Sequence, residues 1–178
     1  LSPAIRSLLE GALGGSGEDA SPPGIDAVRL RPSTLAAADR GGLAAVVGDQ
    51  YVRTGDHDRL LRAGGKSTPD LLRRRQIDQD APDAVVLPGD DDEVAAVLAY
   101  CSRKRIAVVP FGGGTSVVGG LDPIRGEFDA VISLDLRRLD ALHWLDEVSG
   151  EAELGAGLSG PEAERLLGER GFSIGHFP

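Results

Sequence analysis

Short apolar runs bounded by glycine, proline or aspartate dominate the second half of the chain. β-Branched residues are frequent in these runs, and a short run of that composition is typical of a buried strand. Two of the runs flank the tetrapeptide Glu147-Val148-Ser149-Gly150, which predicts a β-hairpin. The predicted strands lie at 83–87, 106–109, 130–134, 142–145 and 152–154, and a last one begins at Phe172.

Helical patterns separate some of these strands. The four carboxylates at 90–93 crowd the start of a helix over 94–103, where they cap backbone N–H groups and complement the helix dipole. Another helix opens at Ser159-Gly160-Pro161 and runs to about residue 169. This order of strands and helices indicates an α+β fold rather than an alternating, doubly wound sheet.

The first 79 residues are expected to form a mostly helical segment ahead of a domain over 80–178. A stretch rich in Gly, Ser, Pro and Asp at 14–24 predicts a loop within this segment. The expected helices lie at 2–11, at 33–47 with a break near Gly41-Gly42, from Asp56 or Asp58 onward, and at 68–75.

The stretch PFGGGTSVVGG at 110–120 directly follows the strand predicted at 106–109. Its three consecutive glycines, Gly112 to Gly114, allow the backbone to adopt positive φ and to approach a ligand closely. Successive N–H groups in such a turn hold an anion, usually a phosphate, and Thr115 and Ser116 add hydroxyl donors. The pattern predicts a strand that ends in a phosphate-binding loop. The alternative is a tight turn that needs glycine for its geometry alone.

Two other glycine motifs are weaker candidates. Gly65-Lys66-Ser67 resembles the end of a Walker A loop, but Leu60 occupies the position of its first glycine, and we reject it. The stretch 155–160 reads G-x-G-x-x-G between a strand and a helix. A dinucleotide site requires an acidic residue at the end of the strand that follows the motif, and the strand predicted here has none. We interpret 155–160 as a tight strand-to-helix connection, with a nucleotide site as the less favoured alternative.

Composition narrows the function classes. The 178 residues include 19 Lys and Arg against 28 Asp and Glu, and this net charge of −9 argues against a nucleic-acid partner. The triplet Arg73-Arg74-Arg75 is therefore interpreted as a solvated helix face. No apolar run approaches the length of a membrane span. Abundant Arg, Ala and Gly hint at a GC-rich bacterial genome.

Few side chains have the pattern of a reaction centre. The single Cys101 excludes an internal disulfide and makes a cysteine-based zinc site implausible, so it is expected to be a small buried filler. The acids at 90–93 form a run at a helix start rather than a cage, so no metal site is predicted. His143 is expected on the solvent face of a strand, and a structural role is favoured for His176.

Several stretches in a fixed order resemble one family. Together they are similar to the first half of the FAD domain of flavoenzymes of the vanillyl-alcohol-oxidase type, the PCMH-type FAD-binding domain. Within that family they resemble the alkyldihydroxyacetonephosphate synthase branch and its bacterial relatives, which are described as FAD-linked oxidases. The matching stretches are 65–73, 81–88, 110–120, 155–157 and Gly175-His176-Phe177-Pro178.

The resemblance implies an α+β fold in which the first, β-α-β half of this FAD-binding domain follows a mainly helical N-terminal segment. It also implies that the 155–160 turn is structural and that Gly175 to Pro178 lead into the flavin-ring pocket. Members with covalent flavin commonly have a histidine directly after the glycines, where this chain has Thr115, so non-covalent FAD is expected. The residues expected to wrap the FAD pyrophosphate are Pro110, Phe111, Gly112, Gly113, Gly114, Thr115 and Ser116.

The implied function is that of an FAD-dependent enzyme like alkyldihydroxyacetonephosphate synthase, in ether-lipid precursor synthesis. One alternative is an oxidase or dehydrogenase of a 2-hydroxy acid or alcohol. Another, of a different class, is a non-catalytic phosphate- or nucleotide-binding module. The sequence begins at Leu1 and contains no Met, so it lacks an initiator. In the family that the chain resembles, further FAD-contacting segments and the substrate domain follow the stretch matched here. The resemblance therefore implies an N-terminal fragment, inactive alone, whose catalytic residues are expected beyond residue 178.

The expected partner is a small-molecule substrate, with no nucleic acid and no transmembrane segment. Homo-oligomerisation is left open. The expected location is the cytoplasm, with peripheral attachment to a membrane through a lipid-like substrate as a further option.

Overall fold

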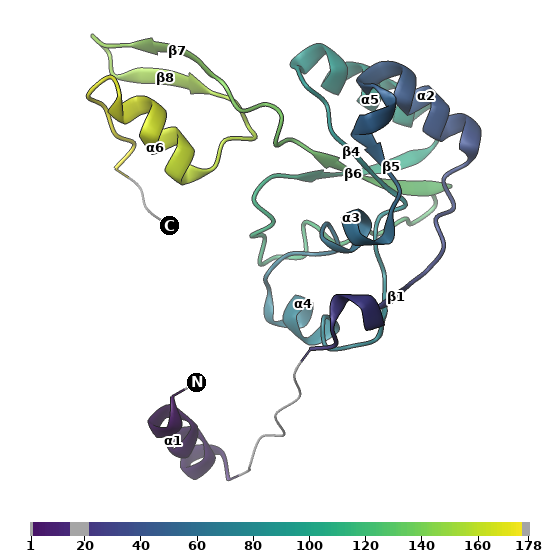
Figure 1. Cartoon of the computed structure of the whole chain (residues 1–178), viewed down its shortest axis with the longest axis vertical. Coiled ribbons are helices and arrows are strands. Elements are labelled where there is room, and N and C mark those ends of the chain that lie inside the picture. The colour runs from purple at the N-terminus through teal and green to yellow at the C-terminus, as the bar shows by residue number, and fades with distance from the viewer. Residues whose placement is uncertain (1, 15–21, 176–178) are drawn as a thin grey trace.

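A mixed sheet with strand order β2-β4-β6-β5 supplies most of the buried hydrophobic cluster among the described residues (Figure 1). The computed structural model describes residues 2–14 and 22–175. Strands β4, β6 and β5 are parallel, and β2 runs antiparallel to β4. The four strands are β2 (Val52–Arg53), β4 (Ala84–Val86), β5 (Ile106–Phe111) and β6 (Ala130–Asp135).

Helices α2 (Ala37–Val47) and α5 (Asp91–Arg103) cover one face of this sheet. Alternation along β6 directs Ala130, Ile132 and Leu134 to this face. There they pack with Leu43 of α2 and Val97 of α5. Helix α5 connects β4 to β5, so β4-α5-β5 is the predicted β-α-β unit, with β6 between its two strands. Asp90 caps α5 by accepting a hydrogen bond from the Glu93 N–H at 2.8 Å, as the carboxylate run predicts.

The opposite face of the sheet is held by buried polar groups. Asp83, 1% exposed, accepts hydrogen bonds from the Val131 N–H at 2.8 Å, the Thr34 N–H at 2.8 Å and the Arg125 guanidinium at 2.9 Å. Arg59, 3% exposed, donates to the Pro82 carbonyl at 2.8 Å. A buried charge is tolerated only when it is paired and hydrogen-bonded, and both of these are.

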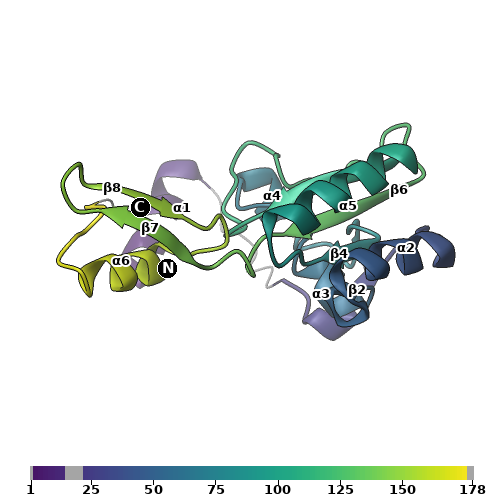
Figure 2. The same ribbon diagram turned by 90° about the horizontal axis from the view of Figure 1, so that it is seen from above.

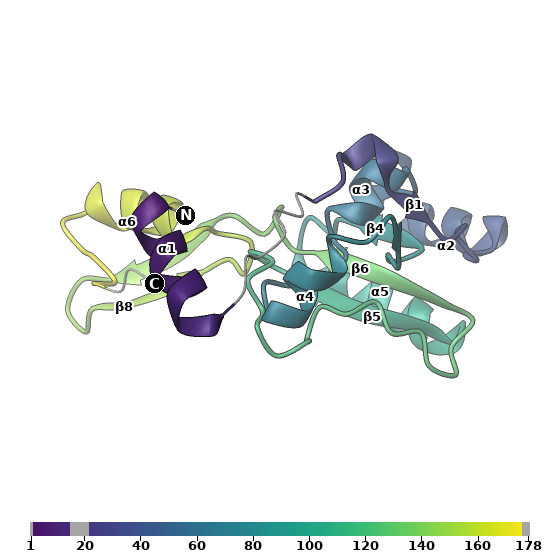
Figure 3. The same ribbon diagram turned by 90° about the horizontal axis from the view of Figure 1, so that it is seen from below.

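The N-terminal segment supplies short elements around the sheet. Helices α3 (Asp56–Leu60) and α4 (Thr68–Arg73) lie on the side of the sheet away from α5 (Figures 1 and 3). The other elements are α1 (Pro3–Leu13), η1 (Ile25–Ala27), β1 (Arg29–Leu30), η2 (Asp49–Tyr51) and β3 (Asp78–Gln79), which pairs in parallel with β1.

The predicted hairpin is present as β7 (Leu142–Asp146) and β8 (Glu151–Leu154), and α6 (Gly160–Gly168) follows it. These three elements lie together beyond the end of β6 (Figures 1 and 2). Within the described ranges, no helix has the length and apolarity needed to cross a membrane.

Two predictions about elements were wrong. Helix α2 runs unbroken through Gly41 and Gly42. A Cβ on Gly42 would stand 2.1 Å from the Tyr100 hydroxyl oxygen, so this glycine admits the Tyr100 ring rather than ending the helix. Residues 172–175, the described part of the last predicted strand, do not form a strand. Their N–H groups are used elsewhere, because Phe172 donates to the Leu167 carbonyl and Ile174 to the Glu164 carboxylate.

Other predictions lie partly or wholly outside the described residues. The predicted loop at 14–24 includes 15–21, and the predicted structural residue His176 belongs to 176–178. The division of the chain at residue 80 stays a prediction.

The two glycines of α2 give a matched test of this packing. Gly41→Ala should raise the free energy of unfolding by about 0.5–1 kcal/mol, because a Cβ there meets nothing and alanine favours a helix. Gly42→Ala should be less stable than Gly41→Ala by about 1 kcal/mol or more, because it displaces Tyr100 from its 3.0 Å hydrogen bond to Asp39. Urea unfolding measures both, and equal stabilisation by the two variants would show that Gly42 has no packing role.

Candidate functional site

The predicted phosphate-binding loop begins where β5 ends, at the carboxyl edge of the parallel strands. Phe111 is the last residue of β5 and is paired with Asp135, the last residue of β6. Ligands of open sheets with parallel strands bind at this edge. The loop from Gly112 to Ser116 therefore lies where the fold favours a binding site. We call these five residues the glycine loop.

The three glycines of the loop differ in whether the structure requires glycine at their position. Gly114 adopts φ of 70°, and a Cβ there would stand 2.7 Å from Cζ of Phe111. Its geometry and the Phe111 ring both require glycine. Gly112 has no positive φ, and a Cβ there would meet nothing within 4 Å; at Gly113 the nearest atom would be Cγ2 of Thr115, at 3.8 Å. Turn geometry alone therefore explains the glycine at 114. It does not explain the glycines at 112 and 113, beside which the space for a Cβ is open.

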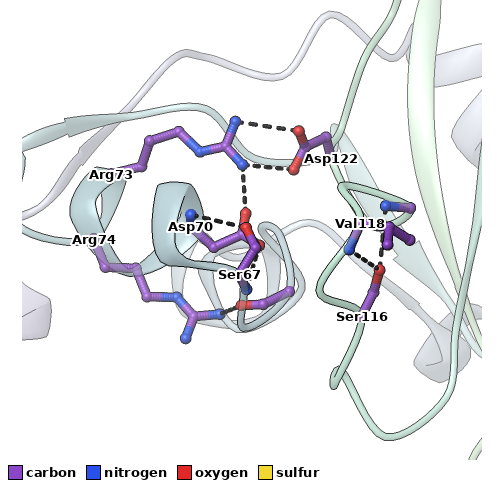
Figure 4. Close-up of polar contacts among 9 residues, drawn as sticks. Ser67, Asp70, Arg73, Arg74, Ser116, Val118 and Asp122 are labelled. Carbon is purple, nitrogen blue, oxygen red and sulfur yellow. Dashed lines mark hydrogen bonds and ion pairs between the residues drawn. The ribbon is translucent and has the colours of Figure 1, made fainter.

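The glycine loop also presents unused hydrogen-bond donors. Among the described residues, the backbone N–H groups of 112–116 have no hydrogen-bond acceptor. Ser116 differs from its predicted role in one respect, because its hydroxyl oxygen accepts hydrogen bonds from the Gly120 N–H at 3.2 Å and from the Val118 N–H at 3.5 Å. Figure 4 shows the contact with Val118. The Ser116 O–H proton is still available for donation. Free backbone donors grouped in one turn are the feature that anion-binding loops share.

The segment that precedes α4 holds the glycine loop from one side. The Lys66 N–H donates to the Ser116 carbonyl at 2.7 Å, and the Gly64 N–H donates to the Leu121 carbonyl at 3.2 Å. A Cβ on Gly65 would stand 2.1 Å from the Ser116 carbonyl oxygen, so only glycine permits this approach. Gly65-Lys66-Ser67, rejected as a Walker motif, is thus a support of the glycine loop.

Helix α4 anchors that support (Figure 4). Ser67 and Asp70 form a capping box at its start, and Arg73 forms ion pairs with Asp70 and, at 2.7 Å, with Asp122 beyond the loop. Hydrogen bonds from Ser67 and then Arg73 outweigh burial and lower the pKa of Asp70 to about 2. Asp70 is therefore an ionised anchor at neutral pH.

A buried arginine, Arg62, supports the glycine loop through its contacts with the ends of β5 and β6. Arg62, 6% exposed, donates from Nε to the Asp135 carboxylate at 2.8 Å, and its Cζ lies 5.3 Å from the centre of the Phe111 ring. Arg137 also donates to Asp135, at 3.0 Å. Burial raises the pKa of Asp135, and the hydrogen bond from Arg62 acts in the opposite direction. No motif marks this pair, because 73 positions separate Arg62 from Asp135.

A hollow of about 430 Å³ lies beside the glycine loop. Lys66 and Arg74 are the charged residues among its described lining, which contains no carboxylate. Such a lining selects for an anion in a chain whose net charge is −9. The residues that line it are Pro22, Pro23, Ile25, Val28, Leu60, Leu61, Gly64, Lys66, Arg74, Gln79, Phe111, Gly113 and Gly114.

The rival motif at 155–160 is structural, as predicted. A Cβ on Gly155 would stand 2.1 Å from the Leu139 carbonyl oxygen, and one on Gly157 would stand 2.0 Å from the Leu136 carbonyl oxygen. The Gly157 N–H donates to the Leu139 carbonyl at 2.8 Å. Two of its glycines thus serve backbone packing.

The other residues considered in the sequence analysis have no part in the candidate site, with the exception of the arginine triplet. Cys101 is a buried filler, as predicted, and burial, with a smaller effect of Asp39, raises the pKa of its thiol to about 11. His143 is exposed, as predicted. Arg73 and Arg75 are exposed, as predicted for a solvated helix face, although Arg73 is also ion-paired with Asp122. Arg74 is half-buried and donates to the Gly65 carbonyl at 2.7 Å.

In a comparison with known protein families, residues 82–178 match the family model described as an FAD binding domain. The chain is 36% identical over 153 residues to an alkyldihydroxyacetonephosphate synthase of Trypanosoma brucei brucei, covering 84% of this chain and 25% of that protein. It is 32% identical over 118 residues to a mitochondrial D-2-hydroxyglutarate dehydrogenase of Danio rerio, covering 64% of this chain and 21% of that protein.

The fold also has a close counterpart among solved structures. A structure of an alkyldihydroxyacetonephosphate synthase superposes with a TM-score of 0.85 at 28% identity, covering 99% of this chain and 34% of that one. The predicted fold class is thereby confirmed. The chain spans about a quarter of the Trypanosoma protein and about a third of the protein in that structure.

The ionised anchor of α4 predicts a pH effect. Asp70→Asn should lower the free energy of unfolding at pH 7 by on the order of 2 kcal/mol, because it removes the capping carboxylate and the partner of Arg73. The pKa of Asp70 is lowered on folding, so its contribution is complete above the unfolded value of 3.8 and is lost as pH falls toward about 2. Urea unfolding from pH 7 to pH 2 should show the two proteins converging over that interval.

Asp49→Asn is the control, because Asp49 is exposed and ion-paired with Arg40 at 2.8 Å. An exposed pair contributes little, so this variant should unfold like the wild type at pH 7. A constant difference between wild type and Asp70→Asn at every pH would contradict the assignment of the effect to ionisation.

Proposed function

This chain belongs to the family of FAD binding domains, and we propose that Pro110 to Ser116 hold the diphosphate of FAD. The open backbone at Gly112 and Gly113, beside N–H groups that have no acceptor in the described chain, is the observation that carries the proposal. Two charged oxygens of a diphosphate require such donors, since an anion is stabilised by several N–H groups at once. The hollow beside the loop supplies positive charge and no carboxylate.

Each residue of the proposed site has a distinct part. Pro110 and Phe111 end β5, and the Phe111 ring fixes Gly114. Gly112 and Gly113 leave space for the phosphate oxygens, and the Thr115 hydroxyl has no partner among the described residues and is exposed. Because Thr115 carries no nucleophilic imidazole, we propose that the flavin is held without a covalent bond.

For the whole protein we propose an activity like that of alkyldihydroxyacetonephosphate synthase, in lipid metabolism. The similarity to such a synthase over 84% of the chain and the superposition over 99% of it support this choice. Bound FAD would supply the flavin ring that accepts electrons or forms a bond to the substrate. The part of this chain is to position the cofactor, and the residues that act on the substrate are proposed to lie beyond 178.

A second candidate activity is the oxidation of a 2-hydroxy acid. The 32% identity to a D-2-hydroxyglutarate dehydrogenase over 64% of the chain favours it. Under either activity, we propose that the substrate is a small molecule. We also propose that the protein is cytoplasmic and comes from a bacterium. Homo-oligomerisation and the division at residue 80 stay predictions.

The gene product that contains this chain should be yellow, with the absorption of an oxidised flavin. Acid precipitation should release the colour into the supernatant if the flavin is non-covalent. Gly112→Ala should weaken FAD binding by about tenfold or more while leaving the thermal melting temperature of the apoprotein unchanged, because its methyl group meets the ligand and no protein atom. Gly41→Ala is the control, since its methyl group also stands in open space but in α2.

A colourless gene product that takes up no FAD would overturn the enzyme proposal and favour a phosphate-binding module. Equal FAD affinity of Gly112→Ala and Gly41→Ala would contradict the placement of the diphosphate at the glycine loop.

Anaerobic mixing separates the two activities. A dehydrogenase should bleach its flavin when mixed with a 2-hydroxy acid such as D-lactate or D-2-hydroxyglutarate, because hydride transfer reduces the ring. A synthase should keep its oxidised spectrum with these acids and should exchange the acyl chain of acyl-dihydroxyacetonephosphate for a fatty alcohol. Bleaching without exchange would contradict the synthase proposal.

A further inference from the structure

We infer that Lys66 and Arg74 form a basic wall that binds the diphosphate opposite the glycine loop. This inference rests on the proposed function and adds two binding residues to it. Both lie in the N-terminal segment, outside residues 82–178 that the family model matches. The motif that contains Lys66 was rejected as a Walker loop, and its place in the fold gives it a different role.

The two side chains share one hollow with the loop. Lys66 and Arg74 line the same hollow of about 430 Å³ as Phe111, Gly113 and Gly114. The backbone of Lys66 is fixed to the loop, because its N–H donates to the Ser116 carbonyl at 2.7 Å. A ligand bound by the glycine loop in this hollow would therefore lie beside both cations.

Both cations lack a carboxylate partner among the described residues. Arg73, the neighbour of Arg74, is ion-paired with Asp70 and Asp122, and Arg62 with Asp135. Lys66 and Arg74 have no such pair, and the hollow presents no described carboxylate to them. The described lining of this hollow therefore has two positive charges and no negative charge. Arg74 also lines a neighbouring hollow that contains Asp70, Asp78, Asp80 and Asp122, whereas Lys66 lines only the hollow beside the glycine loop among those described.

Arg74 is held in place for this role. It is half-buried, and its Nη2 donates to the Gly65 carbonyl at 2.7 Å, next to the contact of Gly65 with Ser116. One of its five N–H donors is used there, and the others remain for a phosphate. A guanidinium fixed by one hydrogen bond loses less side-chain entropy when it binds an anion. The adjacent Arg75 is exposed and does not line the hollow, so it is a natural control.

The test uses the gene product that contains this chain, freed of flavin, and measures FAD binding by equilibrium dialysis at 50 and 300 mM NaCl. Lys66→Gln and Arg74→Gln should each weaken binding about fivefold to twentyfold at low salt, the range of one charge-assisted contact. Each should also reduce the salt dependence of the affinity, because one ionic contact is lost. Arg74→Lys should recover part of the affinity, and Arg75→Gln should bind within about twofold of wild type.

The outcomes separate this inference from the proposed function. Wild-type protein that binds no FAD would overturn both. If the wild type binds FAD, and Lys66→Gln and Arg74→Gln bind it as tightly as Arg75→Gln does, only the basic wall is overturned. A loss of affinity that is equal at both salt concentrations would also overturn it, because a merely structural role leaves the salt dependence unchanged. Lys66→Gln keeps the test decisive if Arg74→Gln fails to fold, since the Lys66 side chain makes no hydrogen bond or ion pair within the described chain.

Discussion

The glycine loop depends on the close approach of two backbone segments, the turn before α4 and the stretch that follows β5. Gly65 allows the Ser116 carbonyl to lie where a Cβ would otherwise stand, and the Lys66 N–H donates to that carbonyl at 2.7 Å. The capping box of α4 and the Arg73–Asp122 ion pair hold both segments in this position. A loop fixed in this way keeps its donors arranged before a ligand arrives, so little ordering cost remains for binding.

A second support acts from within the fold. Arg62 is held by Asp135 and lies against the Phe111 ring, which in turn contacts Gly114. The loop is thus packed on protein at Gly114 and Ser116 and open at Gly112 and Gly113. Positive φ and close contact occur at the supporting positions, and the open positions are those at which we propose that the diphosphate binds. This division of roles within one short loop connects the packing of the sheet to the proposed cofactor site.

Local patterns in the sequence were sufficient for strands β4 to β8, the capped helix α5 and the glycine loop, because each has a short-range signal. The two-residue strands β1, β2 and β3 are too short to carry such a signal and were not predicted. The local signals gave wrong predictions where packing determines the structure. Gly42 accommodates the Tyr100 ring without breaking α2, and residues 172–175, the described part of the stretch from Phe172, form no strand. Contacts between distant positions carried no signal at all. The Arg62–Asp135 pair and the place of Lys66 beside the loop required the folded chain.

The most direct test of the account is hydrogen exchange of the individual amides of the gene product, with and without FAD. The amides of 112–116 have no acceptor in the described chain and should exchange rapidly in the apoprotein. FAD should slow their exchange, because the diphosphate would then accept their hydrogen bonds. Exchange that stays rapid at 112–116 in FAD-saturated protein, with protection elsewhere, would contradict the placement of the diphosphate at the glycine loop.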